Sequence, residues 1–574
     1  MHFALSSSWA SKLRLALLGP VAFALILQAT PACAGDSLVP GIGPLLGGRS
    51  AGDVTPRATK TPLERDSAPT ETYDDSILIP VNDFTISGNS VLSQAQLRPL
   101  LTHLLGKSWT LAQLMTEIQS IAAFYEQAGY PLVSTNIPEQ TLDAGILKLE
   151  VLEPVWGEVQ IETPTKPSAR LLQLATAHLN KGQTIRQSDI DRSTSLLGDI
   201  AGLAVQARLK PGMVLGSTNL VLDAAAASPI TGELTAHNFG GAATGRTQAN
   251  LHLQLNGVAG FGESAAIDGL SSGDGLNSLR SSLELPLPIQ AMRIGAAQSK
   301  VRYQLVGESK FLGAHGWAQQ SSLWIRHALL PVAAANMTAR MQWDAVDLDD
   351  LMNVGAEMGN RRTLNLWGLA LGGEVADNWH LGGRTRWSLG LTRGQVAFHT
   401  EAAQANDAAL ADTQGGFTRV NITGSHTREL TQLDTLNASL DVQWANRNLD
   451  VSQKASLGGA RSVRAYESGV LSGDASMLLI LEMKRAWGDI LGVRWTGLVF
   501  ADYGWVKTNA KPWSDTDNEA SIASIGLGLQ GTVAQQWALS LSIANSIGAL
   551  PAVLQGSQSR HGGIWLEFSK SLSW

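Results

Sequence analysis

The stretch SLGGARSVRAYESGVLSGD, residues 456–474, decides the fold. It joins two segments that have the pattern of β-strands. Two glycines relax its backbone, two arginines carry permanent charges, and a tyrosine supplies a rigid ring with a polar tip. We interpret the stretch as a loop that folds back into a barrel. The residues concerned are Gly458, Gly459, Arg461, Arg464 and Tyr466.

The segments on either side of this stretch alternate or are apolar, as membrane strands are. Residues 436–444 place apolar side chains on one face and polar ones on the other, a period of two over the length of one bilayer-spanning strand. Residues 475–483 are apolar at nearly every position. This predicts a strand without showing which face meets lipid.

A guanidinium inside a barrel needs a carboxylate partner, because an unpaired charge away from bulk water is costly. The next segment with polar residues, LVFADYGWV at 498–506, holds a single acid, Asp502. We therefore predict that Arg464 pairs with Asp502 and fixes the loop for transport, with Arg461 a solvated neighbour. The alternative is an ordinary salt bridge that steadies the barrel, and the two interpretations are compatible.

These residues resemble a known family. VRAY at 463–466, followed by FADYG at 500–504, is similar to the inward-folded sixth extracellular loop and its docking strand in two-partner secretion transporters, the haemolysin secretion/activation protein family. That family belongs to the outer-membrane barrel superfamily that carries POTRA domains. It usually has glycine at the third position of the loop motif. The resemblance implies an inward loop motif made of Gly458, Gly459, Arg461, Val463, Ala465 and Tyr466.

Composition bounds the class of protein. Of the residues, 44% are hydrophobic and 16% are charged, yet no internal stretch reaches the roughly 18 consecutive apolar residues of a transmembrane helix. The net charge of −7 is opposite in sign to that of a typical nucleic-acid-binding protein, which argues against nucleic acid as a partner. The 17 tryptophans suit aromatic belts at a membrane surface.

Residues 1–34 predict a secretory signal peptide. A basic start precedes the apolar residues 15–27, and an Ala-Cys-Ala sequence fits cleavage after Ala34. The alternative is a lipoprotein anchored through Cys33. In both cases the chain leaves the cytoplasm, and no disulfide or thiol chemistry follows.

Residues 35–76 are rich in glycine, proline, serine and threonine, which predicts a flexible arm or linker. Related transporters often begin with a helix that plugs the barrel. The only apolar piece here, residues 38–46, is interrupted by proline and glycine, so the sequence argues against a plug helix at this point.

Residues 77–153 predict a small domain of β-α-α-β-β order. Ser93 and Thr110 are expected to cap two helices, and residues 132–137 and 145–152 are expected to be strands. The phrase FYEQAGYPLVSTNIPEQ resembles a POTRA domain. Residues 154–226 repeat the plan, with a helix capped by Ser188, and LLGDIAGLAVQARLKPG resembles the second POTRA domain of the family.

Residues 227–574 consist of alternating runs separated by glycine and serine turns. An apolar-out, polar-in barrel needs this pattern. A soluble β-sandwich would alternate too, but the signal peptide, the lack of covering helices and the last segment, 564–574, favour the barrel. That segment resembles the C-terminal signal read by the barrel-assembly machinery. The fold class is a transmembrane antiparallel β-barrel, of about 16 strands by resemblance, preceded by two α+β POTRA domains.

Enzyme chemistry finds little support in the sequence. Residues 269–273 satisfy G-x-S-x-G, but a nucleophile elbow needs a helix to follow, and Asp274 and Gly275 form a turn instead. The 11 histidines show no metal-ligand spacing. We therefore predict no enzyme, no metal and no cofactor.

The resemblance implies a translocation pore in the outer membrane of a Gram-negative bacterium. It would export one large partner protein, an adhesin or haemolysin, unfolded and without ATP. Expected contacts are membrane lipid and, during biogenesis, the assembly machinery. We expect a partner segment to add to the periplasmic sheet edge at Leu132, Val133 and Ile137. The alternatives are an assembly factor of the same superfamily, normally with more POTRA domains, and a passive porin, which should lack them.

Overall fold

The computed structural model describes residues 63–65 and 78–574, with gaps at 143, 163–165, 290, 332–334, 355, 378, 380, 535 and 555–561. The described residues lie in one compact unit, residues 39–574. The predicted signal peptide lies outside the described residues, as does the predicted arm except for β1 (Leu63–Arg65). This short strand pairs in parallel with β8 (Leu203–Pro211).

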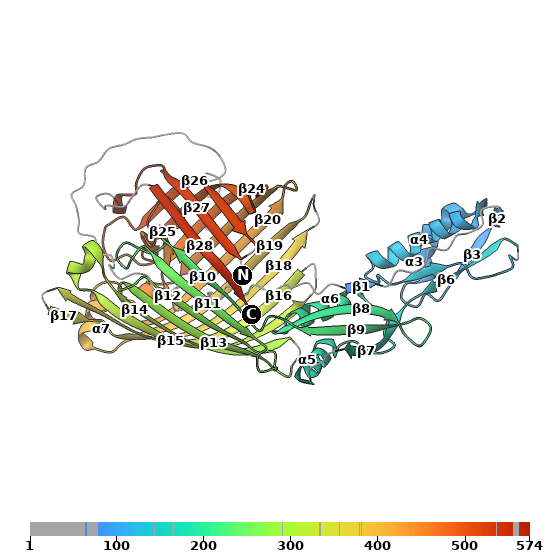
Figure 1. Ribbon diagram of the computed structural model, residues 1–574, viewed down its shortest axis with the longest axis horizontal. Helices are drawn as coiled ribbons and strands as arrows, with labels where there is room; N and C mark the ends of the chain where they lie inside the picture. The colour runs from blue at the N-terminus through green and yellow to red at the C-terminus, as the bar shows by residue number, and fades with distance from the viewer. Residues whose placement is uncertain are drawn as a thin grey trace. The chain divides into compact units, whose positions relative to one another are not determined.

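The first domain is an α+β fold around one apolar core (Figure 1). Its three-stranded sheet has the order β3-β6-β5. A second pair of strands, β2 with β4, is antiparallel. The elements are β2 (Leu78–Val81), β3 (Asp83–Ser87), α3 (Gln94–Leu97), the 3-10 helix η1 (Arg98–Leu104), β4 (Lys107–Thr110), α4 (Leu111–Gln127), β5 (Ser134–Asn136) and β6 (Ile146–Leu152).

The longest helix of this domain begins where the sequence predicts. The Thr110 side chain accepts a hydrogen bond from the Gln113 N–H at 3.3 Å, and the Gln113 side chain accepts one from the Thr110 N–H at 3.0 Å. This capping box satisfies backbone donors at the helix start. The helix then buries Leu114, Ile118, Ile121 and Tyr125 in the core.

The second domain has the sheet order β1-β8-β9-β7. Its remaining elements are β7 (Val155–Glu162), α5 (Lys166–Thr176), α6 (Gln187–Gly198) and β9 (Ser217–Ala226). The predicted cap at Ser188 is wrong, because α6 starts earlier and its N-cap is Arg186. The N–H of Gln187 is already satisfied by the carbonyl of Gly129 at 2.8 Å, so the helix can begin there without a side-chain cap.

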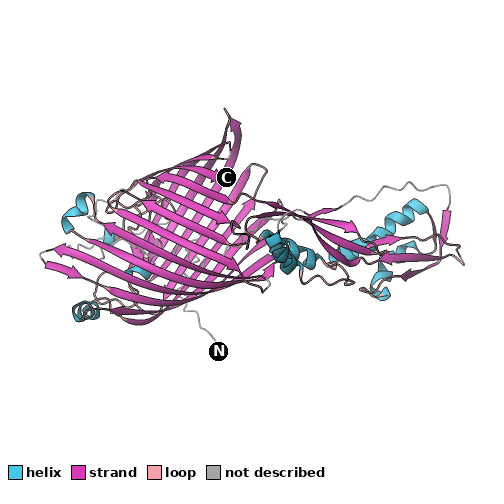
Figure 2. Ribbon diagram, turned by 60° about the horizontal axis from the view of Figure 1, so that its bottom comes forward, coloured by secondary structure: helices cyan, strands magenta, loops and turns pink. Residues whose placement is uncertain are grey.

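The rest of the described chain forms a closed antiparallel barrel of sixteen strands, which confirms the predicted fold class (Figures 1 and 2). β10 and β28 close it over the register Thr231↔Ser573 to His237↔Glu567. The short β17 (Ala356–Gly359) pairs only with the end of β16. The sixteen are β10 (Ile230–His237), β11 (Gln248–Asn256), β12 (Ser264–Ser271), β13 (Leu276–Pro286), β14 (Met292–Gln304), β15 (His315–Pro331), β16 (Ala335–Val354), β18 (Arg362–Asp377), β19 (Gly383–Phe398), β20 (Gly415–Glu429), β21 (Asp434–Ala445), β24 (Ala475–Ile490), β25 (Val493–Lys507), β26 (Glu519–Val533), β27 (Trp537–Ile547) and β28 (Gly562–Ser573).

Alternation along the strands gives the barrel an apolar outside. On β21, Leu440 and Trp444 are exposed on the outer face, whereas Gln443 is buried on the inner one. On β24, Leu481 and Met483 face outward, which settles the orientation that the sequence left open. Lipid must meet side chains that need no hydrogen bonds, and the strands meet this requirement.

The long loop between β21 and β24 is the feature that positions the candidate site. It contains a one-turn 3-10 helix, η3 (Val451–Gln453), and a two-stranded antiparallel ribbon made of β22 (Ala455–Leu457) and β23 (Leu471–Gly473). Other connections carry α7 (Glu401–Ala409), η2 (Gly307–Leu312) and η4 (Ala552–Leu554). No helix among the described residues is long and apolar enough to span a membrane.

Glu153 should stabilise the first domain in a pH-dependent way. Its carboxylate accepts hydrogen bonds from the N–H groups of Ser90 and Val91, each at 3.0 Å, and from the Tyr125 hydroxyl at 2.6 Å. Burial raises the pKa of Glu153, but these donors together hold the net pKa below the ordinary value of 4.5. A depressed pKa gives stability that is present above the unfolded-state pKa and is lost as the pH falls through the folded-state value.

We expect Glu153→Gln to destabilise the first domain by about 1–3 kcal/mol at neutral pH, because a good acceptor is lost. The variant should also lose less stability than the wild type on acidification. Hydrogen exchange of the β3 and β6 amides in the full chain measures both effects. Glu158→Gln, at an exposed carboxylate, is the matched control. Unchanged exchange at neutral pH in the Glu153 variant would contradict the prediction.

Candidate functional site

The loop between β21 and β24 lies against the inner wall of the barrel. Val463, Ala465 and Tyr466 are buried in one apolar cluster with Phe500 and Ile522, which point inward from β25 and β26. Residues on the opposite face of the same strands point outward, as Val499 and Ile525 show by their exposure. The tip of the loop therefore packs inside the barrel, as the resemblance implies.

Arg464 fastens the tip to the wall by charge-assisted hydrogen bonds. Its Nη2 lies 2.6 Å from Asp502 Oδ1 and its Nε lies 3.0 Å from Asp502 Oδ2, which is a bidentate pair. Its Nη1 donates to Glu482 Oε1 at 2.7 Å. The guanidinium also lies over the ring of Phe500, with 3.4 Å between Cζ and the ring centroid.

Asp502 is the acceptor around which the tip is arranged. Its side chain is fully buried, and besides the guanidinium it accepts the backbone N–H of Arg464 at 3.0 Å and the hydroxyl of Ser524 at 2.7 Å. A buried carboxylate with this many donors is well compensated as long as every donor stays in place. Removing the arginine would leave Asp502 without its counter-charge, whereas Glu482 would keep Lys484 at 3.4 Å.

Two glycines of the wall allow the tip to approach. A Cβ at Gly563 would lie 1.9 Å from the carbonyl oxygen of Arg464, and one at Gly504 would lie 2.9 Å from a methyl group of Val463. The same carbonyl accepts a hydrogen bond from the Trp565 indole at 2.7 Å. The sequence did not predict this close approach at Gly563, because a glycine at the end of a strand is typical of a turn.

The remaining residues of the loop motif differ in whether their backbone φ is positive. Gly458 and Gly459 have φ of +97° and +99°, where a side chain would be strained. Ala465 is not among the residues with positive φ, so alanine fits where the family usually has glycine. Arg461 is 78% exposed on its side chain and lies 3.4 Å from Glu567.

A second buried cluster holds the root of the loop, and the sequence did not predict it. Arg362 on β18 is 1% exposed and donates to Asp350 on β16 at 2.7 Å, and it makes a very short contact with Asp450 in the loop. The hydroxyl of Tyr303 donates to the same Asp350 at 2.6 Å. Arg419 donates to the carbonyl of Gln453 at 3.0 Å. We call this group the root cluster.

The other leg of the loop ends at Asp474, which is fully buried. It accepts the N–H of Leu449 at 3.0 Å and the N–H of Ala510 at 2.8 Å, so it joins both legs to the next extracellular connection. Lys454 lies 3.6 Å away and donates to the carbonyl of Thr508 at 2.7 Å. The legs of the loop are thus fixed independently of its tip.

The residues predicted to bind the partner have little free apolar surface. Val133 is 8% exposed and packs in the core of the first domain, and Ile137 is half-buried against that core. Leu132 is half-buried against the core of the second domain. The backbone of β5 is nevertheless at the edge of its sheet.

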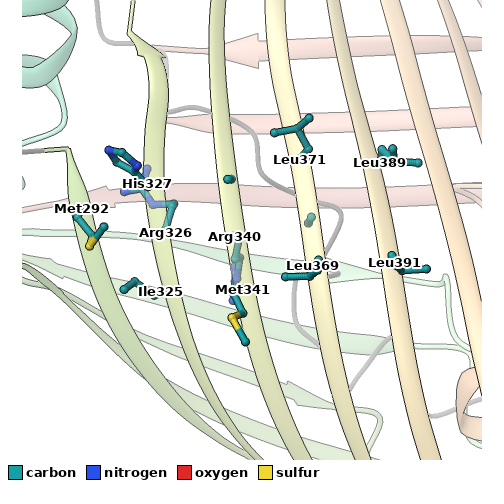
Figure 3. Close-up of a pocket in the computed structure, with 12 residues that line it drawn as sticks. Met292, Ile325, Arg326, His327, Arg340, Met341, Leu369, Leu371, Leu389 and Leu391 are labelled. Carbon is teal, nitrogen blue, oxygen red and sulfur yellow. The ribbon is translucent and has the colours of Figure 1, made fainter. Parts of the chain in front are cut away.

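A hollow of about 380 Å³ lies on the outer wall between β14 and β19 (Figure 3). Its exposed lining is apolar and includes Met341, Leu369 and Leu389. Arg326 and Arg340 also line it but belong to the inner face, where Arg326 contacts Glu284 at 3.1 Å. The hollow suits lipid hydrocarbon and does not resemble a substrate site.

Catalytic chemistry has no structural support among the described residues. The G-x-S-x-G sequence at 269–273 runs from the end of β12 into the turn before β13, so no helix follows the serine. Within the same described ranges, no group of three or more His, Cys, Asp and Glu side chains is placed to hold a metal ion.

Two stretches of the chain match described protein families. The family described as "Haemolysin secretion/activation protein ShlB/FhaC/HecB" matches residues 216–531, and "POTRA domain, ShlB-type" matches residues 79–154. The heme/hemopexin transporter protein HuxB of Haemophilus influenzae (strain 86-028NP) is 23% identical over 87% of this chain and 88% of its own. The outer membrane transporter CdiB of Escherichia coli is 23% identical over 81% of this chain and 78% of its own. The solved structure of CdiB from Escherichia coli shares the fold, with a TM-score of 0.67 and 19% identity over 88% of this chain and 93% of that one.

We expect Arg362→Ala to destabilise the barrel by about 3–5 kcal/mol, because it leaves two buried acids without a counter-charge. Urea titration in lipid vesicles and the temperature at which the folded gel band disappears measure the change. Arg361→Ala is the matched control. That arginine is its neighbour in sequence, is 50% exposed on its side chain and pairs with Asp347 at the surface. Its loss should destabilise the barrel far less than Arg362→Ala does, because an exposed ion pair adds little to stability. Equal effects of the two substitutions would argue against the root cluster as an anchor.

Proposed function

Because the chain belongs to the haemolysin secretion/activation protein family ShlB/FhaC/HecB, we propose that it exports one large exoprotein of adhesin or haemolysin type. The chain is an outer-membrane protein of the two-partner secretion class, and its POTRA domains are periplasmic. This is a family of transporters and not of enzymes. The proposed cargo crosses unfolded and without ATP.

One observation carries the mechanism: a loop is fastened inside a closed barrel by a buried ion pair. The tip contacts β24 through Glu482, β25 through Asp502 and β28 through Trp565. It therefore packs against several strands of the inner wall, where a crossing polypeptide would have to pass. We propose that the tip leaves Asp502 during export and returns afterwards.

The proposed opening depends on where charge is exposed. Glu482 is 20% exposed on its side chain, whereas Asp502 is fully buried. Once the tip moves, water can reach both acids and replace the lost donors, which limits the free energy of opening. The root cluster is fixed to other strands and stays in place, so the loop moves as a tethered arm.

Capture is proposed to occur by strand addition at the edge strand β5. Backbone hydrogen bonds hold an extended segment without demanding a particular sequence, which suits a cargo that arrives unfolded. The barrel itself is proposed to reach the membrane through the barrel-assembly machinery, which would read the terminal strand β28. Two POTRA domains and membership of this family favour export over assembly of other barrels.

We expect Arg464→Ala to abolish export, because the tip loses its only bidentate partner. The measurement is the amount of the proposed large exoprotein that reaches the cell surface. Heat-modifiable mobility on gels shows whether the barrel has folded. Arg464→Ala combined with Asp502→Asn removes the pair without leaving that acid ionised, and should also fail to export.

The matched control for this test is Arg461→Ala, in the same loop three residues before. Its side chain is largely exposed and its contact with Glu567 is 3.4 Å, so export should continue. Normal export by a folded Arg464→Ala protein would remove the proposed role of the pair.

Deleting residues 77–153 should abolish cargo capture and leave pore conductance. The reason is that the first domain has its own core, separate from the barrel. Conductance in planar bilayers and accumulation of the exoprotein in the periplasm measure the two effects. If the variant that lacks residues 77–153 bound the exoprotein as well as the wild type does, capture by this domain would be contradicted.

A further inference from the structure

The turn between β8 and β9 holds three consecutive apolar side chains in solvent. Met213 is 104% exposed, Val214 68% and Leu215 96%. Hairpin turns normally carry Gly, Asn or Asp, whose backbones suit the turn and whose side chains are polar or absent. We call residues 213–215 the apolar tip.

The backbone that carries the apolar tip is held in one conformation. The N–H of Gly212 donates to the carbonyl of Ser217 at 2.8 Å, and the N–H of Ser217 donates to the carbonyl of Val214 at 2.9 Å. The Ser217 hydroxyl donates to the same carbonyl at 2.6 Å. Gly216 has a φ of +77°, which glycine adopts without strain. The three side chains are therefore presented by an ordered turn.

Exposed apolar surface of this kind marks an interaction site, because leaving it in water is unfavourable. In the described part of the two POTRA domains, only three other large apolar side chains are classed as exposed, and they are Leu78, Ile146 and Leu152. None of these is as exposed as Met213 or Leu215. Among the described residues of the two domains, the apolar tip is therefore the most exposed apolar group.

The apolar tip lies beside the sheet edge that is proposed to capture the cargo. β5 pairs with β6 through Ser134 and Leu152. The side chain of Leu152 comes within 3.3 Å of the position that a Cβ would take at Gly216. The carbonyl of Gly216 also accepts the N–H of Val155 at 2.9 Å. A strand added to β5 would thus have Leu152 and the apolar tip close to its end.

The edge strand needs such a neighbour, because its own side chains do not offer an apolar surface. On β5, Thr135 is buried and the two exposed residues, Ser134 and Asn136, are polar. Val133 is buried in the core. The backbone of β5 can hold an extended segment, but any apolar contact to that segment must come from outside the strand.

We propose that Met213, Val214 and Leu215 bind the apolar side chains of an extended, unfolded segment of the exported protein. The proposal rests on the proposed function, since it takes the cargo as the occupant. Met213 suits this role because its flexible, polarizable side chain adapts to different partners. In this arrangement β5 binds the backbone of the segment and the apolar tip binds its side chains.

The test uses the full-length transporter in detergent and two synthetic peptides of equal length. One alternates leucine with threonine and lysine, and the other has serine in place of each leucine. Fluorescence anisotropy gives the affinity of each. We expect the wild type to prefer the leucine peptide by about tenfold, or about 1.4 kcal/mol. The variant with Met213→Ser, Val214→Thr and Leu215→Ser should bind both peptides equally, at the affinity of the serine peptide.

The matched control is Leu78→Ser, at a residue of β2 that is 66% exposed and lies in a different sheet. It should keep the preference of the wild type. Equal thermal unfolding of the variants shows that the exposed substitutions leave the fold intact.

The outcomes separate this proposal from the function on which it rests. If the wild type prefers the leucine peptide and the triple variant keeps that preference, the apolar tip is not the contact, while capture stands. If the wild type binds neither peptide, capture by the periplasmic domains fails, and the proposal for the apolar tip fails with it. The triple variant could instead change self-association or binding to phospholipid vesicles and leave peptide binding unchanged. That result would assign the apolar tip to a second copy or to lipid, and it would overturn the proposal.

Discussion

The structure depends on a buried ion pair between a loop and a strand. Apolar contacts alone would hold the tip inside the barrel in many positions, because they have no direction. The bidentate geometry of Arg464 and Asp502, together with the backbone N–H that reaches the same carboxylate, defines one position. Such a pair adds little net stability when intact and is costly when one partner is removed. Its value here is that it specifies where the tip lies, while the surrounding apolar cluster supplies the binding free energy.

The root and the tip of the loop are held by different contacts, and the difference suits a loop whose tip moves. In the root cluster, Arg362 is sealed from solvent and bonded to two carboxylates on separate parts of the chain. At the tip, one of the two acids, Glu482, keeps contact with the lumen. Opening the root would separate charges that are buried, whereas opening the tip starts at a group that is already partly exposed. The root is the anchor and the tip is the part that the proposed mechanism moves.

Much of this arrangement could be predicted from the sequence, and the failures have physical reasons. The period of two identified the strands, and the single acid in 498–506 identified the partner of Arg464. Glu482 was missed because its strand reads as apolar, and its inward position becomes visible only when the register is known. Arg362 and Asp450 are 88 positions apart, so no local pattern joins them. The burial of the side chains at 132–137 could not be predicted, because a short strand does not reveal which of its faces is covered.

In the proposed capture, the binding surface of the POTRA domains is divided between backbone and side chains. An edge strand offers hydrogen-bonding groups at a fixed spacing, and these groups are the same for every sequence. Selectivity must then come from side chains that stand next to the edge. On β5 those side chains are polar or buried, while a rigid turn of the neighbouring domain carries the apolar ones. Because the two contributions come from different elements, a change in the turn can alter which segments are preferred without altering the strand that holds them. A transporter built in this way can remain general in its grip and still discriminate between segments by their apolar content.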